Sequence, residues 1–287
     1  MNADQITPFV FDDLPVRGAL IHLSRSWRRM LRDHKYDDIV RETLGHAAAA
    51  TGLIAQSMKF DGAITLQIQG KTNLHMLVMQ CTSDLEVRGM ASFDEDGDAE
   101  TFGDLMRNAH CAITVDTGDQ PHQGIVEIEQ SSLASSLQNY FARSVQVQSH
   151  VMLVSDASLS GGILLQQMPG QSMLNDDDWN RLGFVVATLR ASDFEKADGL
   201  RLIGKLFAED DVRVFKSRPV VFRCRCSLQR AEEVLRMLGE EEIREAVEEQ
   251  GIVDVTCEYC GRRRSFDPID ISRLFADNAV SGPDSVQ

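Results

Sequence analysis

The clearest pattern in the first half of the chain is an alternation of apolar and polar residues. Ile64, Leu66 and Ile68 alternate with polar neighbours, which is the two-residue period of a strand with one buried face. Runs of similar character predict further strands at residues 16–23, 74–81, 85–90, 111–115, 124–128, 145–154 and 162–168. Because these strands follow one another along the chain, we expect most of them to pair in antiparallel sheets.

Three segments of the same region change to a helical period. Residues 37–58 contain four consecutive alanines, which combine the highest helix propensity with side chains small enough for close packing. Residues 131–144 place their large apolar side chains on one helical face, and Ser24 or Ser26 can cap a short helix. Strands in succession with helices between them predict an α+β domain over residues 1–170.

The character of the chain changes after the Pro-Gly pair at residues 169–170. Residues 171–223 hold nine acidic and nine basic residues and two helical stretches with an apolar stripe. The residues of the stripe that we single out are Trp179, Leu182, Val185, Leu189, Leu200, Ile203, Leu206 and Phe207. A flexible spacer has no such stripe, so we predict an ordered connector that packs on the N-terminal domain.

Residues 224–287 form a small third segment. Ser227 can cap a helix that ends at Gly239, a second helix runs on to Gly251, and Pro268 begins a third. The eight Glu between positions 231 and 250 indicate a solvated face. A segment this short rarely folds without a metal ion or disulfides.

Four of the six cysteines arrive as two close pairs, Cys224 with Cys226 and Cys257 with Cys260. Thiolates are soft, compact anions, and four of them make a closed tetrahedral Zn²⁺ site without an open position for catalysis. We therefore predict one zinc ion held by these four residues. A disulfide within the C-x-C pair would close a small ring, and strained disulfides are the labile ones. Spacing alone leaves two alternatives, a plain metal staple and a redox-sensitive one.

The two remaining cysteines, and the arginines beside the four predicted ligands, have structural interpretations. Cys81 and Cys111 fall in predicted strands, so we expect core or edge thiols, as free cysteines are among the most buried residues. Zinc with four thiolates carries a net charge of −2. Arg223, Arg225 and the three arginines at 262–264 are placed to balance that charge and keep the thiols ionised.

Composition and missing motifs restrict the function classes. The net charge is −15, from 29 basic and 44 acidic residues, which disfavours contact with phosphate backbones and makes a nucleic-acid partner unexpected. The first residues lack a secretory leader and no apolar run is long enough for a membrane span, so we expect a cytoplasmic protein with reduced thiols. The seven His are scattered and no catalytic motif is present, so we do not expect an enzyme.

A thioredoxin-like active site is the enzymatic interpretation that Cys257-x-x-Cys260 raises. Such a motif lies where a strand enters a helix, because the helix N-terminus lowers the thiol pKa. Here the next helix signal waits until Asp267, which argues against this interpretation.

The energy of a structural zinc site is large compared with what a conformational switch requires. Structural zinc contributes roughly 10–16 kcal/mol of apparent folding free energy, whereas moving a two-state equilibrium from 1:99 to 99:1 takes about 5.5 kcal/mol. Loss of the metal is therefore sufficient to unfold the C-terminal module and to release the connector that it anchors. Pairwise oxidation of the cysteines would remove the metal, because a disulfide sulfur is no longer a thiolate ligand.

The chain resembles the redox-regulated heat-shock protein thirty-three family of holdase chaperones over nearly its whole length. The C-x-C and C-x-x-C pairs with their long gap are the mark of that family. Further matching stretches lie at Phe11 with 16–18, 59–62 with Thr65, Gln67 and Gly70, 140–141 with Ser144, 161–169, and 257–261 with Phe266, Asp270 and Ile271. Ala19 and residues 71–73 depart from the pattern, away from the thiols.

The resemblance implies a function that the spacing does not show. In the reduced state the four cysteines bind zinc and the protein is quiescent. Oxidation pairs Cys224 with Cys226 and Cys257 with Cys260, zinc leaves, and the connector stripe becomes a candidate surface for unfolding client proteins. The family also implies a homodimer when oxidised and transfer of clients to ATP-dependent foldases. The alternative is a zinc-stapled module that binds nucleic acid or a fixed protein partner without redox switching.

Overall fold

The computed structural model describes residues 4–118, 120–169 and 174–276. By its internal contacts the chain divides into two compact units, residues 1–223 and residues 224–287. The segment predicted as a connector belongs to the larger unit. Its expected start after residue 170, like the chain beyond residue 276, lies outside the described residues.

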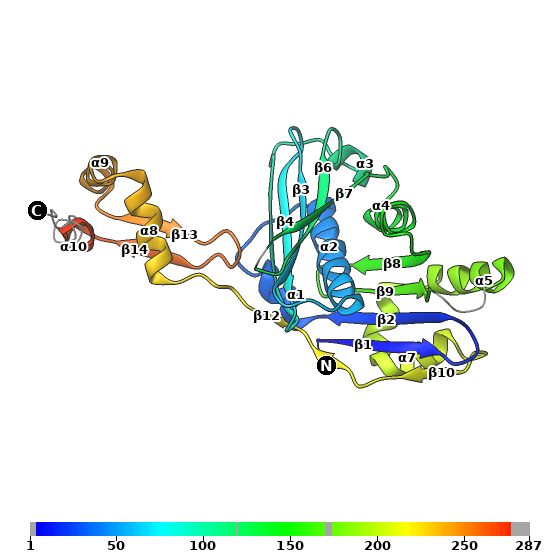
Figure 1. Ribbon diagram of the computed structural model, residues 1–287. Helices are drawn as coiled ribbons and strands as arrows, with labels where there is room; N and C mark the ends of the chain where they lie inside the picture. Colours follow the sequence, from blue (N-terminus) through cyan, green and yellow to red (C-terminus); the bar gives the residue numbers. More distant parts are fainter. Residues whose placement is uncertain (1–3, 119, 170–173, 277–287) are drawn as a thin grey trace, which may run out of the picture. The chain divides into compact units, whose positions relative to one another are not determined.

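Two six-stranded sheets form the frame of the larger unit (Figure 1). Sheet A consists of β1 (Gln5–Phe11), β2 (Val16–Leu23), β8 (Ser149–Ser155), β9 (Ser160–Gln167), β10 (Val212–Val214) and β11 (Arg218–Pro219). Sheet B consists of β3 (Ala63–Gln69), β4 (Leu74–Thr82), β5 (Glu86–Phe93), β6 (His110–Asp116), β7 (His122–Val126) and β12 (Val221–Phe222).

The strand order is β10-β1-β2-β9-β8 in sheet A, with β11 also beside β1, and β12-β5-β4-β3-β6-β7 in sheet B. Every pair is antiparallel except β12 with β5, which run parallel. These sheets, with the helices between their strands, confirm the predicted α+β class with mainly antiparallel pairing.

Helix α2 (Asp38–Ser57) lies against both sheets and joins them into one core (Figure 1). Its four consecutive alanines are fully or almost fully buried. Two glycines bring it close to sheet A: a Cβ at Gly45 would lie 1.9 Å from the Ser155 Oγ, and one at Gly52 would lie 2.4 Å from an Ile21 methyl carbon. The alanines predicted to permit close packing are thus buried, and the two glycines, which were not predicted, make the close approach to sheet A.

The other helices of this unit are short. They are α1 (Arg25–Leu31), α3 (Phe102–Leu105), α4 (Leu133–Tyr140) with a π-helical turn (Phe141–Val145), and α5 (Asp176–Ala187), α6 (Ala191–Lys196) and α7 (Gly199–Leu206) of the connector. The predicted strand at 145–154 therefore starts late, because its first residue belongs to the π-helical turn.

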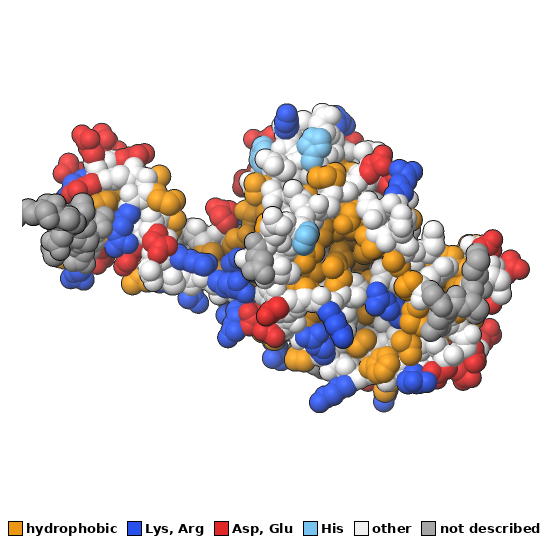
Figure 2. All heavy atoms as spheres, in the orientation of Figure 1, with side chains coloured by type: hydrophobic (Ala, Val, Ile, Leu, Met, Phe, Trp, Pro, Cys, Tyr) orange, Lys and Arg blue, Asp and Glu red, His pale blue; other side chains and the backbone are white. Residues whose placement is uncertain are grey.

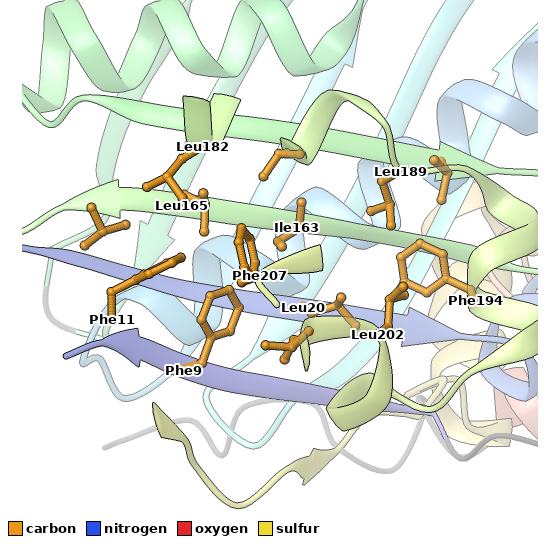
Figure 3. Packing of buried hydrophobic residues seen from close by; sticks show 14 of the residues in the cluster. Phe9, Phe11, Leu20, Ile163, Leu165, Leu182, Leu189, Phe194, Leu202 and Phe207 are labelled. Carbon is orange, nitrogen blue, oxygen red and sulfur yellow. The ribbon is translucent and has the colours of Figure 1, made fainter. Parts of the chain in front are cut away.

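The connector helices cover one face of sheet A, as Figure 3 shows. Phe207 follows α7 and packs against Phe9 and Phe11 of β1, with ring centroids 5.6 and 5.0 Å apart. Leu182 of α5 and Ile163 of β9 join the same cluster and are fully buried. The prediction that the apolar stripe packs on the N-terminal domain is thus confirmed.

Two expectations for the N-terminal region were wrong or incomplete. Neither Ser24 nor Ser26 caps α1 with its side chain; the Asp4 carboxylate accepts hydrogen bonds from the backbone N–H groups of both, at 2.7 Å for Ser24. Burial alone would raise the pKa of Asp4, but these bonds stabilise the charged form and leave its pKa lowered. Strand β1 was not predicted, because Thr7 and Pro8 interrupt its apolar pattern.

The small unit contains α8 (Leu228–Leu238), α9 (Glu240–Gln250), the hairpin β13 (Val253–Thr256) and β14 (Arg263–Phe266), and α10 (Pro268–Ala276). Ser227 caps α8 by accepting a 3.1 Å hydrogen bond from the Arg230 N–H, as predicted. Gly239 and Gly251 have φ of 101° and 81° and end the two helices. Carboxylates gather over α9 (Figure 2), which confirms its solvated acidic face.

Removing the Phe207 ring should loosen the connector from sheet A. Phe207→Ala leaves a cavity between the rings of Phe9 and Phe11, and such truncations cost about 3–5 kcal/mol of unfolding free energy. Leu200→Ala is the matched control on α7, because Leu200 is 60% exposed and its truncation should change the free energy by less than about 0.5 kcal/mol. Urea unfolding of both variants measures this difference; equal free energies would contradict the packing described.

Candidate metal centre

Two separate segments of the small unit supply its four cysteines. Cys224 and Cys226 lie on the extended segment that leads into α8, and Cys257 and Cys260 lie in the turn between β13 and β14. In that turn the Cys257 carbonyl accepts hydrogen bonds from Cys260 N at 3.3 Å and from Gly261 N at 2.8 Å. Gly261 has φ of 63°, a conformation that glycine adopts at little cost. The hairpin therefore points both sulfurs of the second pair the same way.

The four sulfur atoms converge on one point. All four Sγ atoms lie within 4.8 Å of one another, and each cysteine is half-buried. The Sγ of Cys224 is 3.6 Å from that of Cys257, and the Sγ of Cys226 is 3.5 Å from that of Cys260. A tetrahedral ion with metal–sulfur bonds of about 2.3 Å requires sulfur–sulfur distances of about 3.8 Å. The cluster therefore has the dimensions of a four-thiolate metal site.

The electrostatics of the cluster favour a bound cation. Burial, together with hydrogen bonds that the protonated thiol donates to neighbouring sulfurs, raises the pKa of the Cys224 thiol above its ordinary value. Thiolates crowded together without a counter-charge are therefore disfavoured, whereas a divalent cation among them would reverse the effect.

Two of the arginines that were predicted to balance the charge of the zinc site have carboxylate partners in the structure. Arg223 forms an ion pair with Glu86, and Arg263 forms one with Asp254. Their guanidinium groups therefore already have carboxylate partners. That they also balance the charge of a four-thiolate zinc site stays a prediction.

The backbone around Cys257 and Cys260 differs from that of a thioredoxin-like active site. Strand β14 follows the pair, and the next helix, α10, begins only at Pro268. Neither thiol therefore lies at the N-terminus of a helix. This agrees with the order of elements expected from the sequence.

The shortest sulfur–sulfur distances join the two segments rather than the two residues of either pair. In a tetrahedral site all four sulfurs are neighbours, so these distances do not select a disulfide pairing. The pairing of Cys224 with Cys226 and of Cys257 with Cys260 stays a prediction from the family resemblance.

The two remaining cysteines are core residues, as predicted. Cys81 on β4 and Cys111 on β6 are buried, and burial raises the pKa of each thiol to about 12. Near neutral pH both thiols are protonated and therefore weak nucleophiles.

Most of the candidate client-binding stripe is covered in this structure. Leu182, Leu189, Ile203 and Phe207 are at most 2% exposed and belong to the core between the connector and sheet A. Trp179, Val185 and Leu206 are partly buried against the same core. Only Leu200 of the stripe faces solvent, because its position on α7 points away from sheet A. Binding through the other seven residues requires that the connector first leaves sheet A.

None of the helices in the described ranges is long and apolar enough to cross a membrane.

The fold and the cysteine cluster together define a protein with an α+β unit and a small four-cysteine unit suited to one metal ion. A family model described as "Hsp33 protein" matches residues 4–267. A 33 kDa chaperonin from Methylobacillus flagellatus is 39% identical over 97% of this chain and 96% of its own length, and one from Nitrosococcus oceani is 38% identical over 96% of each. This chain belongs to the Hsp33 family of chaperones.

A solved structure supports the same fold. The crystal structure of the 33 kDa chaperonin from Thermotoga maritima matches with a TM-score of 0.80 and 20% identity, covering 97% of this chain and all of that one. At this identity the match is informative about the fold alone.

Replacing one sulfur ligand should weaken metal binding. Cys226→Ser substitutes a poorer ligand for one of the four thiolates, and we expect affinity for the ion to fall by more than about 100-fold, since even outer-shell changes cost about 10–100-fold. The small unit should then be cleaved faster by protease. Metal content per chain and limited proteolysis measure both effects.

Cys111→Ala is the matched control, because it removes a buried thiol that lies outside the cluster. It should retain its metal ion. If Cys226→Ser also retains one ion per chain with unchanged protease resistance, Cys226 is not a ligand.

Proposed function

We propose that this chain is a redox-activated, ATP-independent holdase that is quiescent when reduced and zinc-bound. The observation that carries the proposal is the convergence of four sulfurs at the start of the small unit, directly after the connector. Membership of the Hsp33 chaperone family supports the activity. We assign no catalytic activity and no nucleic-acid partner to it.

Zinc is the ion that suits these ligands best. Cys224, Cys226, Cys257 and Cys260 offer four soft sulfur donors at tetrahedral spacing, which is the donor set of structural zinc sites. Bound zinc would keep the four sulfurs as thiolates and fix the small unit in its folded form. With four protein ligands the site has no open position for a substrate.

Oxidation by a peroxide converts these ligands into disulfides. A thiolate attacks one oxygen of hydrogen peroxide, the S–O bond of a sulfenic acid forms, the O–O bond breaks, and the other oxygen leaves as hydroxide. The second thiolate of the pair attacks the sulfenic sulfur, the S–S bond forms, the S–O bond breaks, and a second hydroxide departs. Each disulfide consumes one peroxide, which accepts two electrons. We propose the pairs Cys224–Cys226 and Cys257–Cys260, following the family resemblance.

Loss of the four ligands is energetically sufficient to unfold the small unit. Structural zinc contributes roughly 10–16 kcal/mol of apparent folding free energy. In the described part of the small unit, residues 224–276, the core comes from short helices and one hairpin. The connector then loses the folded anchor at its C-terminal end. Its stripe and the face of sheet A beneath it would become available to unfolding proteins as apolar surface.

The partners follow from this activity. Clients are unfolded or oxidatively damaged proteins, and ATP-dependent foldases would receive them once reducing conditions return. We propose a homodimer for the oxidised form and a cytoplasmic location, where thiols are ordinarily reduced and oxidation is a signal of stress.

Suppression of aggregation tests the proposal directly. The reduced, zinc-loaded protein should leave light scattering by a chemically denatured test protein unchanged. After treatment with peroxide and mild heat, a stoichiometric amount should abolish most of the scattering, and a dithiol reductant with zinc should reverse the effect. A protein that oxidation leaves inactive, or that is equally active in both states, would instead be a static zinc-stapled module.

A further inference from the structure

The end of the connector, residues 220–223, is extended and lies between β5 on one side and Asp4 and Ser26 on the other. We call the space that it occupies the slot. Val221 and Phe222 form β12, which runs parallel to β5 at its edge and lies beside α1 (Figure 1). On the β5 side, Val221 N donates to the Leu85 carbonyl at 3.1 Å and Arg223 N donates to the Val87 carbonyl at 3.0 Å. The backbone N–H groups of alternate residues in the segment thus donate to β5, as they do between neighbouring strands of a sheet.

The opposite side of the slot binds the other two residues of the segment, Val220 and Phe222. Val220 N donates to the Asp4 carbonyl at 3.1 Å, and Phe222 N donates to the Ser26 Oγ at 3.0 Å. The Ser26 hydroxyl in turn donates to the Val220 carbonyl at 3.4 Å. All four consecutive backbone N–H groups of residues 220–223 are therefore satisfied by partners that lie outside the connector.

The side chains of this segment alternate in burial. Val220 is 2% exposed and Phe222 is 9% exposed, whereas Val221 between them is 54% exposed. The Arg29 guanidinium lies 5.9 Å from the centroid of the Phe222 ring, within the range of a cation–π contact. The slot accordingly accepts a bulky apolar residue, then any residue, then an aromatic one.

A carboxylate at the far end adds a charge preference. Glu86 pairs with Arg223, the last residue of the segment. The slot therefore fits an extended peptide with the order apolar, any residue, aromatic, basic, and most of its contacts are to the backbone of that peptide.

We propose that this slot is a binding site for extended segments of client proteins, occupied in the quiescent state by the chain's own residues 220–223. The inference rests on the proposed function, since oxidation must release the connector before the slot is free. Without β12, β5 becomes an edge strand with unpaired backbone groups, which is a template for strand addition. Recognition through the backbone tolerates many sequences, which suits a protein that binds unfolded chains.

A peptide with the sequence of residues 218–223, Arg-Pro-Val-Val-Phe-Arg, is the probe. Fluorescence anisotropy should show at least about tenfold tighter binding to the oxidised, metal-free protein than to the reduced, zinc-loaded one. Methylating the peptide nitrogens that correspond to Val221 and Arg223 removes two donated hydrogen bonds and should weaken binding about ten- to hundredfold. A scrambled peptide of the same composition keeps its backbone donors, so it should lose less affinity than the methylated peptide does.

Equal binding of the native, methylated and scrambled peptides to the oxidised protein would overturn the inference. If the same sample still suppresses aggregation, the holdase function stands and only the slot assignment falls. A native peptide that binds only by dissociating an oxidised dimer would assign the slot to a second copy of the chain, and would also overturn the client assignment.

A variant that frees the slot without oxidation separates the two proposals. In the full chain with Val220→Gly and Phe222→Gly, both buried side chains of the segment are removed. The reduced, zinc-loaded variant should bind the native peptide at least about tenfold more tightly than the reduced wild type does, while the methylated peptide stays weak. Binding at the wild-type level would contradict the slot assignment, whatever the oxidised protein does in the aggregation assay.

Discussion

The convergence of four sulfurs on one point is the constraint on which the rest of this chain depends. Among its described residues, the small unit buries a core of seven apolar side chains drawn from short elements. A unit of this size gains too little from burial to offset its conformational entropy comfortably. Because the sulfurs come from two segments far apart in sequence, a bound ion would join these segments and close the unit. Folding of the small unit and binding of the ion would then be a single equilibrium.

The connector is stabilised in a different way. Its helices bury aromatic and aliphatic side chains on sheet A, and its strands extend both sheets. These are ordinary core packing and strand-pairing interactions. They bury the apolar connector residues that we propose bind unfolded proteins. Under the proposed function, a connector that both covers an apolar face and completes two sheet edges would itself block client binding. The free energy of metal binding at the sulfur cluster and the packing that holds the connector on sheet A can therefore be coupled through the chain between Phe222 and Cys224.

The sequence was most informative where a local pattern has a physical cause. Strands with one buried face and the connector stripe follow from periodicity, and the four cysteines follow from ligand spacing. Strand β1 was missed because Thr7 and Pro8 interrupt its apolar pattern, so that only its pairing with β2 and β10 in the structure defines it. Strand β14 was missed because its arginines and serine resemble a loop. The exposure of Leu200 depends on how the two-turn helix α7 is rotated, which helical spacing alone did not fix.

Interactions across long sequence separations account for the remaining differences. Asp4 caps a helix twenty residues later, and Ser26 binds backbone nearly two hundred residues away. No sequence motif predicts either role, because each depends on segments that come together only in the folded protein. The pairing of β12 with β5 is of the same kind. Only the structure shows which strand pairs with the end of the connector.

Hydrogen–deuterium exchange of the connector during metal removal tests the central claim most directly. We expect that chelating the metal from the protein and then oxidising the cluster makes the amides of residues 176–223 exchange rapidly, while those of β3 and β4 stay protected. Metal content and free thiols measured on the same samples should change in step with that exchange. A metal-free, oxidised protein whose connector amides remain as protected as in the loaded form would contradict the account.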